Sequence, residues 1–250
     1  MTVSTEAQNL AQKVEVFVRE RIAPFEHDPR CGAHGPEDSL IRELRVLARE
    51  AGLLTPHIRA DGSHFSHLET ASILRAAGLS PLGPPGLNVA APDEGNMFLL
   101  GKVASAEQQH RFLAPLIAGE ARSAFFMTEP AADGGAGSDP SMLQTRAWRD
   151  GNHWVIEGRK AFITGADGAK VGIVMAMSEE GATLFLVDLP DPAIRIERIL
   201  DTIDSSMPGG HSVVKIDRIR VPADQVLGEV GEGFRYAQVR LAPARLTHCM

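Results

Sequence analysis

The stretch Phe125-Phe126-Met127-Thr128-Glu129-Pro130 lies where the pattern of the sequence changes. Before it, apolar residues recur at intervals of three and four, which is typical of amphipathic helices. After it, short β-branched or aromatic runs follow one another at intervals of about ten residues, separated by Gly, Asp, Asn and Pro, which is typical of strands. The chain therefore divides into a helical part and a β part.

The helical part carries recognisable start and stop signals. Thr5 and Gln8 could open the first helix as a capping box, and Ser105 with Gln108 repeats that spacing before a later helix. Gly52 suits the position just after a helix end. The predicted helices cover residues 10–22, 40–51, 67–77 and a segment from 105 to about 117, with one more between the last two.

The β part contains seven candidate strands, and Asp150-Gly151 is a hairpin-type turn between two of them. Their spacing favours an antiparallel sandwich or small barrel over a doubly wound parallel sheet. From Phe234 the pattern turns helical again. The fold class is thus α+β: a helical domain (1–122), an antiparallel β-barrel domain (123–233) and the beginning of a C-terminal helical domain (234–250). The strands are predicted at 124–127, 143–148, 153–157, 171–177, 183–187, 194–199 and 212–221.

Composition argues against several classes of function. A net charge of −7 gives no electrostatic reason to bind nucleic acid or an anionic membrane surface. No run of about 18 apolar residues is present. Cys31 and Cys249 lack any zinc-binding spacing, and so do the nine histidines, which we interpret as surface or core imidazoles rather than metal ligands. We expect a cytoplasmic protein without a metal site.

Residues 131–138 form a loop rich in Gly and Ala. Such a loop can bring backbone N–H groups close to an anionic pyrophosphate. The alternative is an ordinary polar loop between two strands, and the spacing alone favours that alternative because no GK[ST] follows.

Several further motifs accompany the stretch at 125–130. They lie at 136–139, Phe162-Ile163-Thr164 within 158–165, 88–97, 105–109, Val221-Pro222 and 227–234. In this order, the motifs resemble the acyl-CoA dehydrogenase family, in the branch that contains its members ten and eleven and their bacterial relatives. The family typically has Trp where this chain has Phe162, and its loop after the Glu-Pro pair is shorter.

The resemblance implies that FAD is the cofactor. Phe125, Met127 and Thr128 would lie along the flavin, with Thr128 donating to its pyrimidine side. The segment Phe162-Ile163-Thr164 would pack beside the ring, with Thr164 near N5. For both threonines the alternative is β-propensity alone.

The resemblance also implies an acyl-CoA substrate. Ser138 would contact both FAD and the CoA chain, and Arg245 would help to hold CoA, since a guanidinium suits phosphate and adenine groups. The alternative for Arg245 is a solvated helix residue. The family's catalytic glutamate is expected beyond Met250, so no residue is assigned as the base, and Glu129 is not given that role.

The implied activity is α,β-dehydrogenation of a saturated acyl-CoA to a trans-2-enoyl-CoA in fatty-acid catabolism (β-oxidation). An electron-transfer flavoprotein is the expected acceptor, and a homo-oligomer (dimer or tetramer) is expected at full length. We expect the chain to be an incomplete portion of such an enzyme. The alternatives are a flavin-dependent oxidase or monooxygenase on the same fold, and a truncated, non-catalytic binding or assembly subunit.

Overall fold

The computed structural model describes residues 2–131, 134 and 139–247. Ser4 caps the first helix, because its side chain accepts a hydrogen bond from the N–H of Ala7. The expected capping box of Thr5 and Gln8 is therefore wrong, since Thr5 is already helical. The capping box of Ser105 and Gln108 is confirmed. The principal helices are α1 (Thr5–Phe17), α2 (Asp38–Glu50), α3 (His67–Ala77), α4 (Gly83–Gly86), α5 (Asp93–Val103), α6 (Ala106–Gln108), α7 (Ala114–Ile117) and α8 (Gly233–Thr247).

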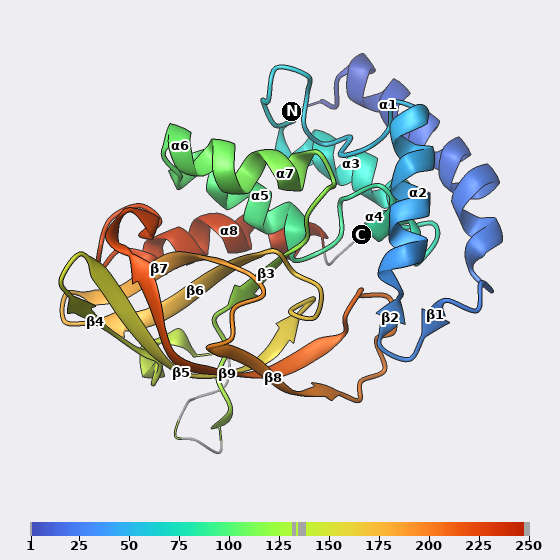
Figure 1. The fold of residues 1–250 in the computed structure, drawn as a ribbon. Helices are drawn as coiled ribbons and strands as arrows, with labels where there is room; N and C mark the ends of the chain where they lie inside the picture. The colour runs from blue at the N-terminus through green and yellow to red at the C-terminus, as the bar shows by residue number, and fades with distance from the viewer. Residues whose placement is uncertain (1, 132–133, 135–138, 248–250) are drawn as a thin grey trace.

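The second half of the chain forms a seven-stranded curled sheet (Figure 1). Its hydrogen-bonded order is β3-β6-β4-β5-β9-β8, and β7 also pairs with β6. The strands are β3 (Ser123–Phe126), β4 (Arg146–Asp150), β5 (His153–Thr164), β6 (Val171–Ser178), β7 (Gly181–Asp188), β8 (Ile194–Leu200) and β9 (His211–Pro222); a small hairpin, β1 (Cys31–Gly32) with β2 (Gly35–Pro36), lies near the sheet.

The expected architecture, a helical domain followed by a β domain, is confirmed, but the strand directions need one correction. Most neighbours are antiparallel, as in the β4–β5 hairpin whose turn follows Asp150. However, β3 and β4 each run parallel to β6, so the sheet is mixed. Parallel neighbours require a long connection, and local spacing does not reveal where such a connection returns.

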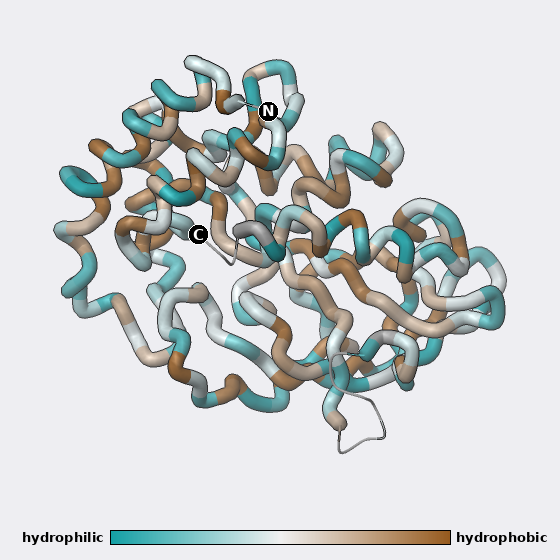
Figure 2. Tube along the Cα trace, turned by 180° about the vertical axis from the view of Figure 1, so that it is seen from behind, coloured by the Kyte–Doolittle hydropathy of each residue, from teal (hydrophilic) through white to brown (hydrophobic). Residues whose placement is uncertain are grey.

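Two apolar cores flank the sheet. The inner core fills the curl of the sheet, where the rings of Trp154 and Phe185 meet edge-on with centroids 5.4 Å apart. The outer core joins the sheet to α5, α7 and α8. A separate core binds the N-terminal helices together. Figure 2 shows hydrophobic segments running through these layers.

A buried polar network ties α5, α8 and β3 together. Asp93 Oδ1 accepts hydrogen bonds from the N–H and hydroxyl of Ser123, both at 2.6 Å. Asn96 donates to Ser123 Oγ at 2.9 Å and accepts from Arg240 Nε at 2.6 Å. The Arg240 guanidinium also lies 4.1 Å from the ring centre of Phe125. The helical layer, the sheet and α8 therefore share one set of buried hydrogen bonds.

None of the helices in the described part of the chain is both long enough and apolar enough to cross a membrane. The predicted domain boundaries at residues 122 and 233 remain predictions. The change from helix to strand falls at Ser123, and α8 begins at Gly233.

Candidate functional site

A β-bulge near the end of β5 turns one aromatic side chain outward. The pairing of β5 with β9 shifts register between Lys160 and Ile163. Phe162 has a positive φ of 57° and the residue is 64% exposed, while Ile163 beside it is fully buried. A positive φ is uncommon for a bulky residue and persists where the surrounding structure determines it. The bulge therefore presents Phe162 as an exposed, flat apolar surface.

A buried ion pair holds the strand that carries this bulge. Lys160 Nζ lies 2.9 Å from Glu129 Oε1 and also donates to the carbonyl oxygens of Met127 at 3.1 Å and Met175 at 2.8 Å. Three donors thus meet three acceptors. Burial lowers the pKa of Lys160 to about 8, and the attraction of Glu129 only partly offsets this effect.

Glu129 is fully engaged on its other side. Its carboxylate accepts from the N–H of Gln144 at 2.6 Å and from the N–H and hydroxyl of Thr145 at 2.9 and 2.5 Å. Burial raises the pKa of Glu129, but Lys160 and these donors together hold it below its usual value. Glu129 therefore anchors the segment after β3 and is poorly placed to accept a proton from a ligand.

Thr128 and the bulge are hydrogen-bonded to each other. The N–H of Ala161 donates to Thr128 O at 3.0 Å, and the Thr128 hydroxyl donates back to Ala161 O. The structure thus joins Met127 and Thr128 of one motif to Lys160 and Ala161, the two residues that precede Phe162 in another motif. In this arrangement the hydroxyl proton of Thr128 is already directed to a backbone oxygen.

Thr164, the last residue of β5, contacts a histidine. Its Oγ1 lies 2.9 Å from Nδ1 of His211, the first residue of β9. The other ring nitrogen, Nε2, lies 3.3 Å from Asp204 Oδ2. Thr164 and His211 are both partly exposed. A chain of three polar side chains therefore ends at Thr164, two residues from Phe162.

The other predicted site residues lie elsewhere. Phe125 faces the outer core beneath Arg240, and the side chain of Ile163 is buried in the inner core. Arg245 is exposed near the end of α8, a helix that packs against α5 and β7. Ser138 lies outside the described residues.

Sequence reasoning did not assign a role to Lys160, His211 or Asp204. Lys160 lies within a quoted motif, and a lysine among the buried residues of a strand could have signalled an ion pair. Nothing in the local sequence links Asp204 and His211 to Thr164, because the register of β9 against β5 creates that contact.

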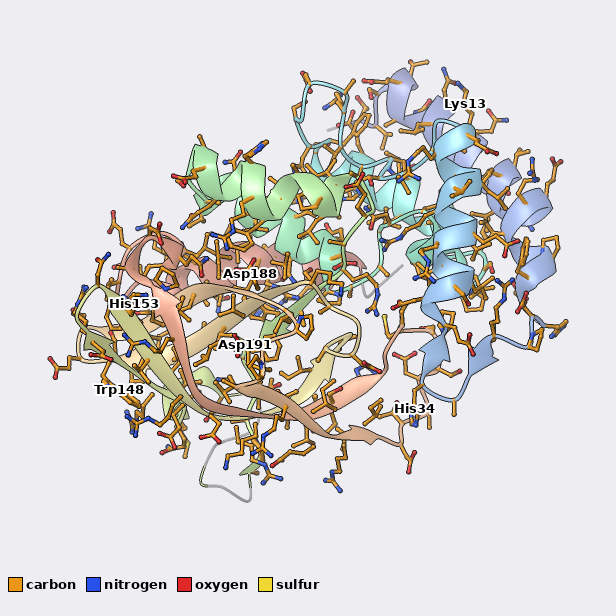
Figure 3. The ribbon with its side chains drawn as sticks, in the orientation of Figure 1. Lys13, His34, Trp148, His153, Asp188 and Asp191 are labelled. Atoms are coloured by element: carbon orange, nitrogen blue, oxygen red, sulfur yellow. The ribbon has the colours of Figure 1, made fainter. Side chains whose placement is uncertain are left out.

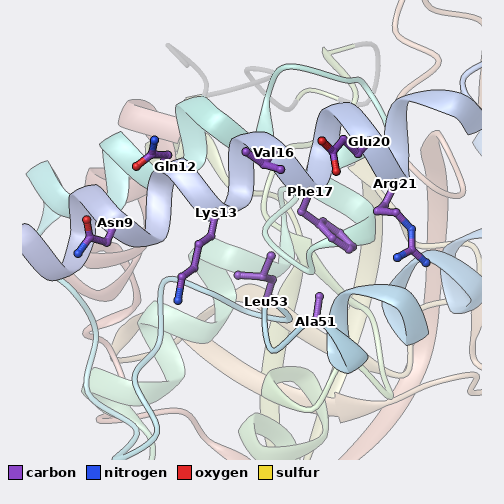
Figure 4. A pocket seen from close by; sticks show the side chains of 9 residues that line it. All are labelled: Asn9, Gln12, Lys13, Val16, Phe17, Glu20, Arg21, Ala51 and Leu53. Atoms are coloured by element: carbon purple, nitrogen blue, oxygen red, sulfur yellow. The ribbon is translucent and has the colours of Figure 1, made fainter.

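Two grooves differ in how close they lie to the predicted site residues. One, of about 700 Å³, lies beside α1 and is lined by Lys13, Phe17 and Leu53 among others (Figure 4). It contains none of the predicted site residues. The other, of about 540 Å³, adjoins Glu129 and Pro130 and is bordered by Arg159 and Lys215. The second groove therefore borders the segment that follows β3.

The described residues contain no group of three His, Cys, Asp or Glu side chains that could hold a metal ion. His57 is fully buried, and burial lowers its pKa to about 3. His57 is therefore a neutral core imidazole at physiological pH.

Both halves of the chain match family models. Residues 4–120 match the acyl-CoA dehydrogenase N-terminal domain, and residues 124–210 match the acyl-CoA dehydrogenase middle domain. The helical part and the curled sheet thus correspond to two successive domains of one class of enzymes. The chain belongs to the acyl-CoA dehydrogenase family.

Similar proteins agree with this assignment. The chain is 34% identical to the probable acyl-CoA dehydrogenase FadE2 of Mycobacterium tuberculosis, over 99% of this chain and 64% of that protein. It is 33% identical to acyl-CoA dehydrogenase family member 11 of Gallus gallus, over 99% of this chain and 34% of that protein. The chain therefore spans less than two thirds of the length of these relatives.

Solved structures show the same fold. A glutaryl-CoA dehydrogenase from Mycobacterium smegmatis in complex with FADH2 superposes with a TM-score of 0.81 at 26% identity, covering 98% of this chain and 61% of that one. A structure from Mycobacterium abscessus assigned to the acyl-CoA dehydrogenases gives a TM-score of 0.86 at 34% identity, covering 99% and 66%.

Proposed function

We propose that this chain forms the flavin-facing part of a FAD-dependent acyl-CoA dehydrogenase, which converts a saturated acyl-CoA to a trans-2-enoyl-CoA in fatty-acid catabolism. The observation that carries the proposal is Phe162. An exposed aromatic side chain on a positive-φ bulge, held by a buried ion pair behind it, offers a flat wall suited to an isoalloxazine ring.

The residues around the bulge fit a flavin. Phe162 supplies the apolar surface, and the partly exposed Thr164 adds a hydroxyl close by. The donor expected from Thr128 is engaged with Ala161, so Thr128 would have to turn its hydroxyl to meet the cofactor. Phe125 and Ile163, which face the cores, would contribute packing beneath the site rather than direct contact.

Bound FAD would supply an acceptor for the hydride that leaves the acyl group. The residues of this chain would orient the ring and shield it from water on the side of Phe162. Ser138 and Arg245 remain proposals as CoA contacts. The catalytic glutamate is expected in the part of the family's length that this chain does not span, so no residue here is proposed as the base.

Further parts of the proposal rest on family membership. Electrons would pass to an electron-transfer flavoprotein, and the full-length enzyme would form a homo-oligomer. A cytoplasmic location stays a prediction from composition.

The test is an absorption spectrum of the 250-residue chain with added FAD, followed by anaerobic addition of a panel of acyl-CoAs. We expect a bound-flavin spectrum, which Phe162→Ala weakens and Val46→Ala, an exposed substitution on α2, leaves unchanged. Absence of flavin binding would contradict the proposal for this chain.

The same experiment separates the alternatives. Flavin that binds without bleaching points to a chain that needs a base from another part of the family's length or that serves only in binding. Bleaching followed by rapid oxygen consumption on exposure to air indicates an oxidase or monooxygenase.

A further inference from the structure

The geometry points to Asp204 and His211 as positioning residues for Thr164: we infer that the charge state of His211 decides whether the Thr164 hydroxyl presents a hydrogen or a lone pair to a bound flavin. This inference rests on the proposed flavin site. It assigns a role to a pair that lies behind the site and outside the motifs.

The hydrogen-bond chain restricts where protons can lie. The carboxylate of Asp204 can only accept, so its 3.3 Å contact with His211 favours a proton on Nε2. In neutral His211 the other nitrogen, Nδ1, is then an acceptor and takes the hydroxyl hydrogen of Thr164 across 2.9 Å. In this state the Thr164 hydroxyl can offer a bound ligand only an oxygen lone pair.

Protonation of His211 reverses the second bond. Nδ1 then carries a hydrogen and donates to Thr164 Oγ1. The hydroxyl hydrogen of Thr164 is released and can be donated elsewhere. Because oxidised flavin presents ring nitrogen and carbonyl acceptors along its polar edge, this second state matches it better.

The carboxylate that drives this arrangement is itself fixed. Asp204 Oδ1 accepts from the N–H of Ser206 at 2.9 Å and from its hydroxyl at 2.7 Å, which leaves Oδ2 for His211. These donors together lower the pKa of Asp204, although its burial acts in the opposite direction. Asp204 is therefore held as a hydrogen-bond acceptor that faces His211.

Other charged groups surround the turn that leads into His211. Arg122 donates to the carbonyl oxygens of Gly165 and Pro208, and its charge is balanced by Asp38 at 2.9 Å. Asp167 lies against Gly209, and His34, in the β1–β2 hairpin, lies against Gly210 (Figure 3). Among these groups, Asp204 is the one that contacts the imidazole directly.

The first measurement needs no flavin. Nitrogen NMR of histidine-labelled protein reports which ring nitrogen carries the hydrogen. We expect the Nε2–H form for neutral His211 in the native chain and loss of that preference in Asp204→Asn. Asp61→Asn is the matched control, because Asp61 makes the same two contacts, with Ser63 at 2.9 and 2.6 Å, but among the described residues it bonds to no histidine ring. A neutral His211 with its hydrogen on Nδ1, or one unaffected by Asp204→Asn, overturns the inference.

The second measurement is the dissociation constant of FAD between about pH 5 and pH 8. We expect FAD binding to weaken by about three- to tenfold as pH rises. This change in affinity is the size expected for the loss of one hydrogen bond. His211→Asn removes this dependence, whereas His153→Asn, at the start of β5, retains it (Figure 3).

The outcomes distinguish the two proposals. An identical pH profile in the native chain and His211→Asn overturns the positioning role and leaves flavin binding intact. Failure of the native chain to bind FAD at every pH contradicts the proposed function and, with it, the role of Thr164 toward the cofactor.

Discussion

At the scale of single residues, the Glu129–Lys160 pair is the most consequential contact behind the site. Lys160 is fully buried and Glu129 is 5% exposed, and every hydrogen-bond donor of the ammonium has a partner. A buried pair adds little stability over an apolar substitute, but removal of one partner leaves the other charge uncompensated. The pair therefore makes the position of the bulge depend on both residues.

Glu129→Gln should lower the free energy of unfolding by about 3 kcal/mol at neutral pH, since Lys160 loses its counter-charge. Because the folded-state pKa of Glu129 is lowered, its contribution is complete above the ordinary value near 4.5 and is lost as pH falls through the folded value. Urea unfolding at several pH values should show the two proteins converging in acid.

A surface pair provides the control for this prediction. Asp188 lies 2.6 Å from Arg111, but both side chains are more than half exposed (Figure 3). Asp188→Asn should therefore change stability little. An equal loss of unfolding free energy in Glu129→Gln and Asp188→Asn would show that burial does not make the contribution of Glu129 larger than that of a surface carboxylate.

At the scale of the element, strand β5 combines a long ladder with two register shifts against β9. The first lies near Gly158, where a side chain would meet Thr145, and the second presents Phe162. Bulges re-aim side chains and are common next to functional sites. The first register shift thus lies where Gly158 packs closely against Thr145, and the second lies where Phe162 is exposed.

Phe162→Gly should separate stability from binding. Glycine adopts a positive φ without penalty, so the free energy of unfolding should rise by about 1 kcal/mol, while FAD affinity should fall about tenfold. Arg218→Gly, at another positive-φ residue of φ 58°, should share the first effect and not the second. Denaturant unfolding and flavin titration measure the two quantities. Unchanged affinity in Phe162→Gly would remove Phe162 from the proposed site.

At the scale of the whole molecule, Arg240 links the three layers. It is 8% exposed, donates to Asn96 and covers Phe125. Burial lowers its pKa to about 10, although Glu94 and Asp93 act in the opposite direction. The contact between helices and sheet is therefore partly electrostatic.

Arg240→Met should destabilise the protein by about 3 kcal/mol, because Asp93 and Glu94, both buried, lose compensating charge. Arg235→Met, on the same helix with a side chain 73% exposed, should be nearly neutral. Thermal or chemical unfolding compares the two. Equal effects would show that α8 is held by apolar packing alone.

Local chemistry was sufficient to predict much of the fold. The change from helix to strand near Ser123, the cap at Ser105 and the turn after Asp150 follow from periodicity and turn propensity, which act over a few residues. The family resemblance, carried by contiguous motifs, was also readable from the sequence, and the family models confirm it.

Only the tertiary structure decided how those segments meet. The sequence by itself determined the helical and β halves and the family, because these depend on neighbours along the chain. The parallel partners of β6, the burial of Lys160 against Glu129 and the contact of Thr164 with His211 join residues that lie 31 to 48 positions apart. Such contacts depend on strand register and burial, which are settled only when the whole sheet closes over its core.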